Sequence, residues 1–135
     1  MPTLLVTGAN RGLGLGFARH YAAAGWRVIG ACRAPEEAVA LRKLPNAQVL
    51  PLDLADEGSI AALAEAVGGT PLDLLINNAG VLGPQPTSLG QLQQEDWLGV
   101  LSVNSVGPAL LTEALEANVL ASRGKTVVNV SSGLA

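Results

Sequence analysis

The stretch Thr7-Gly8-Ala9-Asn10-Arg11-Gly12-Leu13-Gly14 decides the fold, because it joins a short apolar run to a helical segment. Gly8 permits the sharp turn off a strand, Gly12 lets backbone approach a pyrophosphate, and Gly14 lets the helix pack closely on the sheet. The N-terminus of the helix then offers free N–H groups and a positive dipole to an anion. This context predicts a phosphate-binding turn, and an ordinary glycine-rich turn between strand and helix is the alternative.

Outward from this turn, short apolar runs alternate with helical stretches. The predicted strands are residues 3–7, 27–32, 48–52, 72–76 and 126–130, and the predicted helices are residues 12–24, a short stretch from residue 35, a stretch after residue 56 and residues 91–119. Such alternation predicts right-handed crossovers and a parallel sheet covered on both faces. The expected fold class is α/β, a doubly wound parallel sheet of the Rossmann type, formed as one domain over residues 1–135.

Two of the helical stretches carry apolar residues at helical spacing. These residues are Leu13, Phe17 and Tyr21 in the first, and Ile60, Leu63, Ala64 and Val67 in the third, which Gly68 closes. The longest predicted helix contains the run Val103-Asn104-Ser105-Val106-Gly107-Pro108. Asn, Gly and Pro are poor residues for a helix interior, so we expect a local irregularity there. Residues 80–90 are rich in Gly, Pro and Ser and predict a loop.

Composition and charge exclude several classes of protein. The net charge of −3 leaves no electrostatic footprint for nucleic acid. Cys32 is the single cysteine, which excludes an internal disulfide and a cysteine-rich zinc site. No apolar run approaches the roughly 18 residues that cross a bilayer, and the N-terminus has no basic flank. We therefore expect a soluble cytoplasmic protein without a metal, a membrane anchor or a nucleic-acid partner.

The end of the second predicted strand bears on the choice of a dinucleotide cofactor. An acidic residue there binds the ribose 2′-hydroxyl of NAD, whereas a nearby arginine accommodates the 2′-phosphate of NADP. Cys32 occupies the expected acidic position and Arg33 follows it, while Arg11 lies within the glycine turn. The guanidinium fork matches phosphate oxygens, so NADP is the expected cofactor, ahead of NAD. Two solvated surface arginines are the alternative.

The glycine spacing here is G-x-x-x-G-x-G, and not the G-x-G-x-x-G of the commoner dinucleotide fold. With the preceding Thr7 it resembles the fingerprint T-G-x-x-x-G-x-G of the short-chain dehydrogenase/reductase family. The resemblance covers essentially the whole chain, in order. Within the family, residues 11–16, 31–33 and 104–108 are most similar to the carbonyl-reductase or C-factor-like branch.

The resemblance implies a set of cofactor-binding residues. They are Gly8, Asn10, Arg11, Gly12, Leu13, Gly14, Arg33, Asp53, Leu54, Asn78, Ala79 and Gly80. The element Asn77-Asn78-Ala79-Gly80 is implied to stabilise the central sheet and to line the adenine ribose pocket, with Asn78 mainly structural. Asp53 matches the family residue beside the adenine ring, and a helix-flanking acid is an equally good interpretation.

Two catalytic residues are implied in the same way. Asn104 matches the active-site asparagine that helps hold a water of the proton relay. Ser132, just beyond the fifth strand, matches the serine whose hydroxyl hydrogen-bonds the substrate carbonyl oxygen. Taken alone, they read as an ordinary polar helix residue and a turn-forming serine. The implied reaction is hydride transfer between NADP(H) and a small-molecule carbonyl or alcohol.

One family element has no counterpart in these 135 residues. The proton donor of the family is a tyrosine in Y-x-x-x-K beyond the catalytic serine, and its lysine lowers the pKa of that tyrosine. The single tyrosine, Tyr21, lies in the first helix, and neither Lys43 nor Lys125 stands four residues after it. We therefore expect a C-terminally incomplete chain that is inactive alone. A non-catalytic dinucleotide-binding or interaction module of the same fold is the alternative.

If the C-terminal part of the family fold is absent, we also expect apolar surface to be exposed. Residues 126–130 would form a bare strand edge, and the helical stretch with Leu110, Leu111 and Leu115 would lose part of its covering. We expect self-association of the chain, and a homo-oligomer when the protein is complete.

Overall fold

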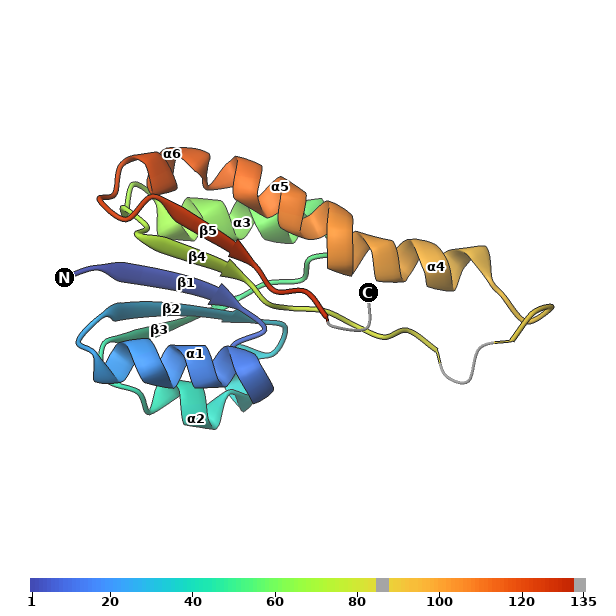
Figure 1. Cartoon of the computed structure of the whole chain (residues 1–135), viewed down its shortest axis with the longest axis horizontal. Helices are drawn as coiled ribbons and strands as arrows, with labels where there is room; N and C mark the ends of the chain where they lie inside the picture. The colour runs from blue at the N-terminus through green and yellow to red at the C-terminus, as the bar shows by residue number, and fades with distance from the viewer. Residues whose placement is uncertain (85–87, 133–135) are drawn as a thin grey trace.

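The computed structural model describes residues 1–84 and 88–132, which form a five-stranded parallel sheet between two layers of helices (Figure 1). The strands are β1 (Thr3–Thr7), β2 (Arg27–Cys32), β3 (Ala47–Pro51), β4 (Leu74–Asn77) and β5 (Thr126–Asn129). Their order is β3-β2-β1-β4-β5, and every neighbouring pair is parallel. The chain winds outward from β1 to β3, then crosses back to β4 and β5. This order confirms the predicted doubly wound sheet.

The helices divide between the two faces of the sheet (Figure 1). One face carries α1 (Gly12–Ala23), the 3₁₀ turn η1 (Pro35–Glu37) and α2 (Val39–Arg42). The other carries α3 (Glu57–Val67), α5 (Gly107–Ala114) and α6 (Glu116–Leu120). Helix α4 (Gln94–Leu101) and the π-helical turn η2 (Ser102–Val106) continue from α5 and project beyond the sheet as an arm.

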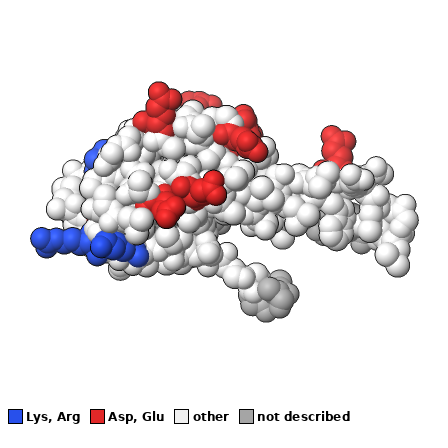
Figure 2. Space-filling view, turned by 90° about the horizontal axis from the view of Figure 1, so that it is seen from above, with Lys and Arg blue, Asp and Glu red and all other residues white. Residues whose placement is uncertain are grey.

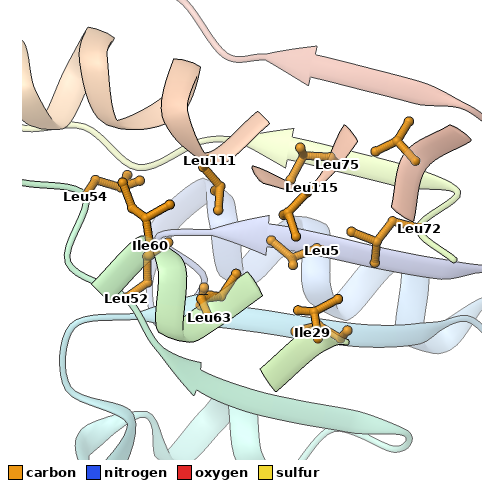
Figure 3. Packing of buried hydrophobic residues seen from close by; sticks show 13 residues of the cluster. Leu5, Ile29, Leu52, Leu54, Ile60, Leu63, Leu72, Leu75, Leu111 and Leu115 are labelled. Carbon is orange, nitrogen blue, oxygen red and sulfur yellow. The ribbon is translucent and has the colours of Figure 1, made fainter. Parts of the chain in front are cut away.

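Two apolar clusters fill the space between the sheet and its helices, because alternate residues of each strand point to opposite faces. The cluster under α3 and α5 contains Leu5, Ile29, Leu52, Leu54, Ile60, Leu63, Leu72, Leu75, Leu111 and Leu115 (Figure 3). The cluster under α1 and α2 contains Leu4, Val6, Leu15, Val28, Leu41, Leu74 and Ile76. The central strand β1 is buried along its whole length, as continuous apolar runs in parallel sheets predict.

Helix α1 forms where its periodicity predicts it, and the predicted Phe17 and Tyr21 pack against the core, but its most buried residues are others. Its buried residues are Gly14, Leu15, Ala18 and Ala22. Leu13 is 58% exposed, and Phe17 and Tyr21 are only partly buried. The small side chains of the buried face let the helix axis approach the sheet closely. In α3 the predicted residues Ile60, Leu63 and Val67 are buried and Ala64 is partly buried, and Gly68, with φ of 60°, ends the helix.

The predicted irregularity in the long helix is the π-helical turn η2. Pro108 follows it and has no N–H to donate to the preceding turn, so the regular helical bonding pattern cannot pass through this point. Gly107 lies directly against the carbonyl oxygen of Leu54, and a Cβ at this position would overlap with that oxygen. The helical region predicted over residues 91–119 begins at Gln94, contains the predicted irregularity at η2 and is interrupted again at Leu115. The predicted loop over residues 80–90 falls partly on 85–87, which lie outside the described residues.

Strand β5 is exposed as the sequence predicts, whereas the predicted loss of covering over Leu111 and Leu115 is wrong. Strand β5 lies at the sheet edge, where Val127 and Val128 are each 38% exposed. Leu111 and Leu115, however, are fully buried, because α5 packs on the sheet beside α3.

The exposed apolar residues lie on α4 instead. None of its residues is buried, and Trp97, Leu98 and Leu101 are 55%, 53% and 48% exposed. Viewed from above the α3–α5 face, the Asp and Glu side chains gather over the body of the molecule, whereas the arm carries little charge (Figure 2). No helix in the described ranges is both long enough and apolar enough to span a membrane.

Candidate functional site

A cleft of about 670 Å³ opens at the carboxyl ends of β1, β2, β3 and β4. Thr7 at the end of β1, Cys32 at the end of β2, Leu52 after β3 and Asn78 after β4 all contribute to its wall. Strand β1 lies between β2 and β4, so the cleft sits where the winding of the sheet reverses. Doubly wound proteins bind their ligands in a crevice at this switch point.

The cleft gathers ten of the twelve predicted cofactor residues. They are Gly8, Asn10, Arg11, Gly12, Arg33, Asp53, Leu54, Asn78, Ala79 and Gly80. The other two, Leu13 and Gly14, belong to the first turn of α1 but do not line the cleft. A role in cofactor binding stays a prediction for all twelve.

The glycine turn has the backbone geometry that its sequence predicts. Gly8 and Gly12 have φ angles of 61° and 56°, in the left-handed region that favours glycine. A Cβ at Gly14 would overlap with the carbonyl oxygen of Gly8 and lie 2.6 Å from Nδ2 of Asn78. Arg11, which precedes α1, makes no side-chain capping bond, so the N–H groups of the first turn remain available to an anion.

Asn78 fastens the segment after β4 to the end of β1. Its Nδ2 donates to the carbonyl oxygen of Thr7 at 3.1 Å. In return, Oγ1 of Thr7 accepts from the N–H groups of Asn78 and Ala79, each at 3.0 Å. These bonds hold two cleft walls together, which agrees with a mainly structural Asn78.

Asp53 lies in a tight turn after β3 and lines another part of the cleft wall. Its Oδ1 accepts from the N–H of Ala55 at 3.0 Å, and its own N–H donates to Oγ of Ser59 at 2.8 Å. Leu54 follows and is 7% exposed, with its carbonyl against Gly107. The structure is compatible with both interpretations of Asp53, because this residue precedes α3 and also lines the cleft.

The end of β2 supplies the charged part of the wall. Burial raises the pKa of the Cys32 thiol, so a neutral group stands at the expected acidic position. Arg11 and Arg33 are exposed in the cleft, and within residues 1–84 and 88–132 neither forms an ion pair. Both guanidinium groups are therefore available to a phosphate.

Sequence reasoning missed Glu37, which lines the same cleft from the η1 turn. The N–H of Glu37 donates to the carbonyl oxygen of Ala34 at 3.0 Å, which folds the chain back after β2. The available signal was its spacing, because a residue four positions after Arg33 returns to the same side once the chain turns helically.

Asn104 reaches the cleft through Val81. Its Oδ1 accepts from the N–H of Val81, and its Nδ2 donates to the carbonyl oxygen of Val81, each at 2.8 Å. Val81 lines the cleft, whereas Asn104 does not. The contact shows that Asn104 braces this wall, and its predicted part in holding a water stays a prediction.

Ser132 follows β5 and is exposed. Because β5 runs parallel to β4, Ser132 lies at the same carboxyl edge of the sheet as the cleft, although it is not part of the cleft wall. Its predicted catalytic role likewise stays a prediction.

Comparisons with known proteins agree with this geometry. Residues 2–135 match the family model described as short chain dehydrogenase. Galactitol 2-dehydrogenase from Agrobacterium fabrum is 36% identical over 137 residues, which cover 95% of this chain and 51% of that protein. The chain thus spans about half the length of the curated relatives it matches.

Solved structures give the same result. A metagenomic short-chain oxidoreductase in complex with NADP superimposes with a TM-score of 0.85 at 34% identity, over 97% of this chain and 61% of that one. The NADPH-bound carbonyl reductase from chicken fatty liver gives 0.77 at 36% identity, over 88% of this chain and 52% of that one. The parallel sheet, the glycine turn and the family match over residues 2–135 together show that this chain belongs to the short-chain dehydrogenase family.

Proposed function

We propose that this chain forms the cofactor-binding part of an NADP(H)-dependent oxidoreductase, which transfers a hydride between nicotinamide and a small carbonyl or alcohol substrate. The observation that carries the proposal is the cleft, in which Arg11 and Arg33 are unpaired within the described residues and Cys32 replaces an acidic residue. The relatives solved with NADP or NADPH support the same cofactor.

The residues of the cleft fit this cofactor. The left-handed Gly12 and the uncapped first turn of α1 would meet the pyrophosphate, while Arg11 and Arg33 would meet the 2′-phosphate. When bound, NADPH supplies the hydride. No carboxylate stands at the end of β2 itself, so nothing at that position repels the phosphate.

The substrate would meet the carboxyl end of β5. There the hydroxyl of Ser132 would donate to the substrate carbonyl oxygen, and Asn104 would keep the Val81 wall in place. Within the 135 residues, the single tyrosine lies in α1, so we propose that these residues alone bind cofactor without turnover.

A binding titration of the chain tests the cofactor. We expect wild type to bind NADPH more tightly than NADH, and Arg33→Ala to lose about tenfold or more in NADPH affinity, since a charge-assisted hydrogen bond contributes about 1.5–3 kcal/mol. Arg19→Ala is the matched control, because Arg19 is an exposed arginine of α1 outside the cleft. Equal affinities of wild type for the two cofactors would end the NADP assignment.

Turnover distinguishes an enzyme from a binding module of the same fold. We expect the full-length product of the gene to reduce a reactive diketone with NADPH, and Ser132→Ala to lose at least a hundredfold in kcat. Tight NADPH binding without any turnover by that product would favour the non-catalytic module.

We also propose that the complete protein is a homo-oligomer, as its exposed apolar helix α4 supports. Light scattering tests this on wild type and on Trp97→Glu. A monomer at high concentration in wild type would contradict it.

A further inference from the structure

Asn77, the last residue of β4, is buried between the sheet and α5 with 7% of its surface exposed. Its Nδ2 donates to Oδ1 of Asn129 on β5 at 2.9 Å and to Oγ1 of Thr112 on α5 at 3.1 Å. Its Oδ1 has no partner within the described residues. Both hydrogen bonds of the Asn77 side chain are therefore made through Nδ2, one to Asn129 on β5 and one to Thr112 on α5.

Thr112 fixes the direction of this contact. Its hydroxyl donates to the carbonyl oxygen of Pro108 at 2.8 Å, so it presents a lone pair to Asn77 and receives the Nδ2 proton. The same Nδ2 carries a second proton, which meets Asn129. A chain of hydrogen bonds thus runs from α5 through Asn77 to the end of β5.

The backbone of Asn77 holds the next residue as well. Its carbonyl oxygen accepts from the N–H of Val130 at 3.0 Å. Asn77 therefore hydrogen-bonds two successive residues: Asn129 of β5 through its side chain, and Val130 just after β5 through its backbone. Ser132 stands only two residues further along.

Strand β5 is joined to β4 by one side-chain hydrogen bond among the described residues, that of Asn77 and Asn129. In the described part of the chain it pairs only with β4, and all four of its residues are exposed. Without this bond, only backbone hydrogen bonds would join the end of β5 to β4 in the described part of the chain.

We propose that Asn77 and Asn129 form a positioning pair, which fixes the end of β5 and thereby sets where the Ser132 hydroxyl lies. The inference rests on the proposed role of Ser132 in carbonyl reduction. Neither asparagine lines the cofactor cleft, and the side-chain partners of Asn77, Thr112 and Asn129, do not line it either, so we expect the pair to act on the reacting geometry and not on cofactor binding. Misplacing a reacting group by about 1 Å can cost about a hundredfold in rate.

Three variants of the full-length gene product test this proposal. Asn129→Ala removes the acceptor, whereas Asn129→Asp keeps an oxygen for Nδ2 of Asn77. Thr112→Val removes the other partner of Asn77 and leaves β5 untouched. Whichever way the side-chain amide of Asn77 is turned, Asn77 in this variant keeps one hydrogen bond to the side-chain amide of Asn129, which is exposed and can turn to match it.

We expect Asn129→Ala to lower kcat at least tenfold with a KM for NADPH within twofold of wild type. Asn129→Asp should restore kcat to within threefold, and Thr112→Val should keep kcat within twofold even if its melting temperature falls. An unchanged kcat in Asn129→Ala would overturn the proposal. So would an equal loss in Thr112→Val, because the pair would then matter only for helix packing.

Amide hydrogen exchange provides a readout that needs no turnover. We expect exchange at the Val130 N–H to speed up at least tenfold in Asn129→Ala and less than threefold in Thr112→Val. If wild type bound no NADPH and reduced no carbonyl, the proposed function would fail, and exchange would still decide the positioning. Unchanged exchange in Asn129→Ala would refute the positioning itself.

Discussion

Asn104 holds the backbone of Val81 through both ends of its side-chain amide, with each hydrogen bond 2.8 Å long. The two residues are 23 positions apart, and the contact ties the π-helical turn η2 to the segment after β4. Val81 lines the cleft, so a residue outside the cleft is hydrogen-bonded to its wall.

Removing this brace should weaken cofactor binding. We expect Asn104→Ala to lose about five- to twentyfold in NADPH affinity, which corresponds to about 1–2 kcal/mol for two lost hydrogen bonds at an exposed site. Ser105→Ala is the control, since Ser105 is an exposed neighbour in the same turn. Isothermal titration calorimetry measures both, and equal affinities of the two variants would argue against the brace.

Two glycines of α1 should respond to alanine in opposite directions. A Cβ at Gly14 would overlap with the Gly8 carbonyl oxygen, whereas a Cβ at Gly16 has no neighbour within 4 Å. We expect Gly14→Ala to destabilise the fold by about 1–3 kcal/mol. Gly16→Ala should stabilise it by up to about 1 kcal/mol through helix propensity. Urea denaturation measures both, and a shift of the same sign in the two variants would contradict the close packing at Gly14.

Glu37 should weaken the preference for NADPH, because its carboxylate lines the cleft that holds Arg33. We expect Glu37→Gln to raise NADPH affinity about two- to fivefold, since an exposed charge pair contributes up to about 1 kcal/mol. NADH affinity should stay the same or fall. Glu36→Gln is the matched control, because Glu36 precedes it in the same turn and does not line the cleft. Equal effects of the two substitutions would point to net charge alone.

Asp73 should make the stability of the fold depend on acid. Its carboxylate accepts from the N–H of Thr3 at 2.9 Å and from that of Gly124 at 3.2 Å, and the Thr3 bond foremost lowers the pKa of Asp73 below its ordinary value. A lowered pKa in the folded state stabilises the fold above the ordinary pKa of about 3.9, and this contribution is lost as the pH falls through the folded value.

We therefore expect Asp73→Asn to cost about 1 kcal/mol at pH 7, a value reduced for solvent exposure. The gap to wild type should close as the pH falls below about 4. Chemical denaturation at pH 7, 5 and 3 measures it, and a gap that stays constant over this range would show that the charge is not involved.

The sequence predicts those parts of the fold that local backbone chemistry determines. Gly8 and Gly12 adopt positive φ, and Gly68 ends α3, because few other residues tolerate these conformations. The weak point at Asn104-Ser105-Val106-Gly107-Pro108 is visible because Pro108 lacks an N–H, whereas the close packing of Gly107 on Leu54 beside the π-helical turn joins residues far apart in the sequence.

Features that depend on distant contacts were harder to predict. The sequence pattern does not distinguish Leu111 and Leu115 from the exposed apolar residues of α4, because their burial depends on the packing of α5 beside α3. The Asn77–Asn129 contact joins residues 52 positions apart, so no local pattern shows it. Glu37 reaches the cleft only through the tight turn after β2.

The central place of β1 has a consequence for the synthesis of the protein. It leaves the ribosome before the other four strands of this sheet, yet its neighbour β4 follows about 70 residues later, the separation that the Thr3–Asp73 hydrogen bond spans. At about 5–20 residues per second, one edge of this fully buried strand stays unpaired for about 4–14 s. An unpaired strand edge is a template for pairing with another chain, because its backbone N–H and C=O groups are free. Synonymous codons that slow translation between α1 and β4 would lengthen this interval, and they should lower the yield of folded protein without changing a single residue.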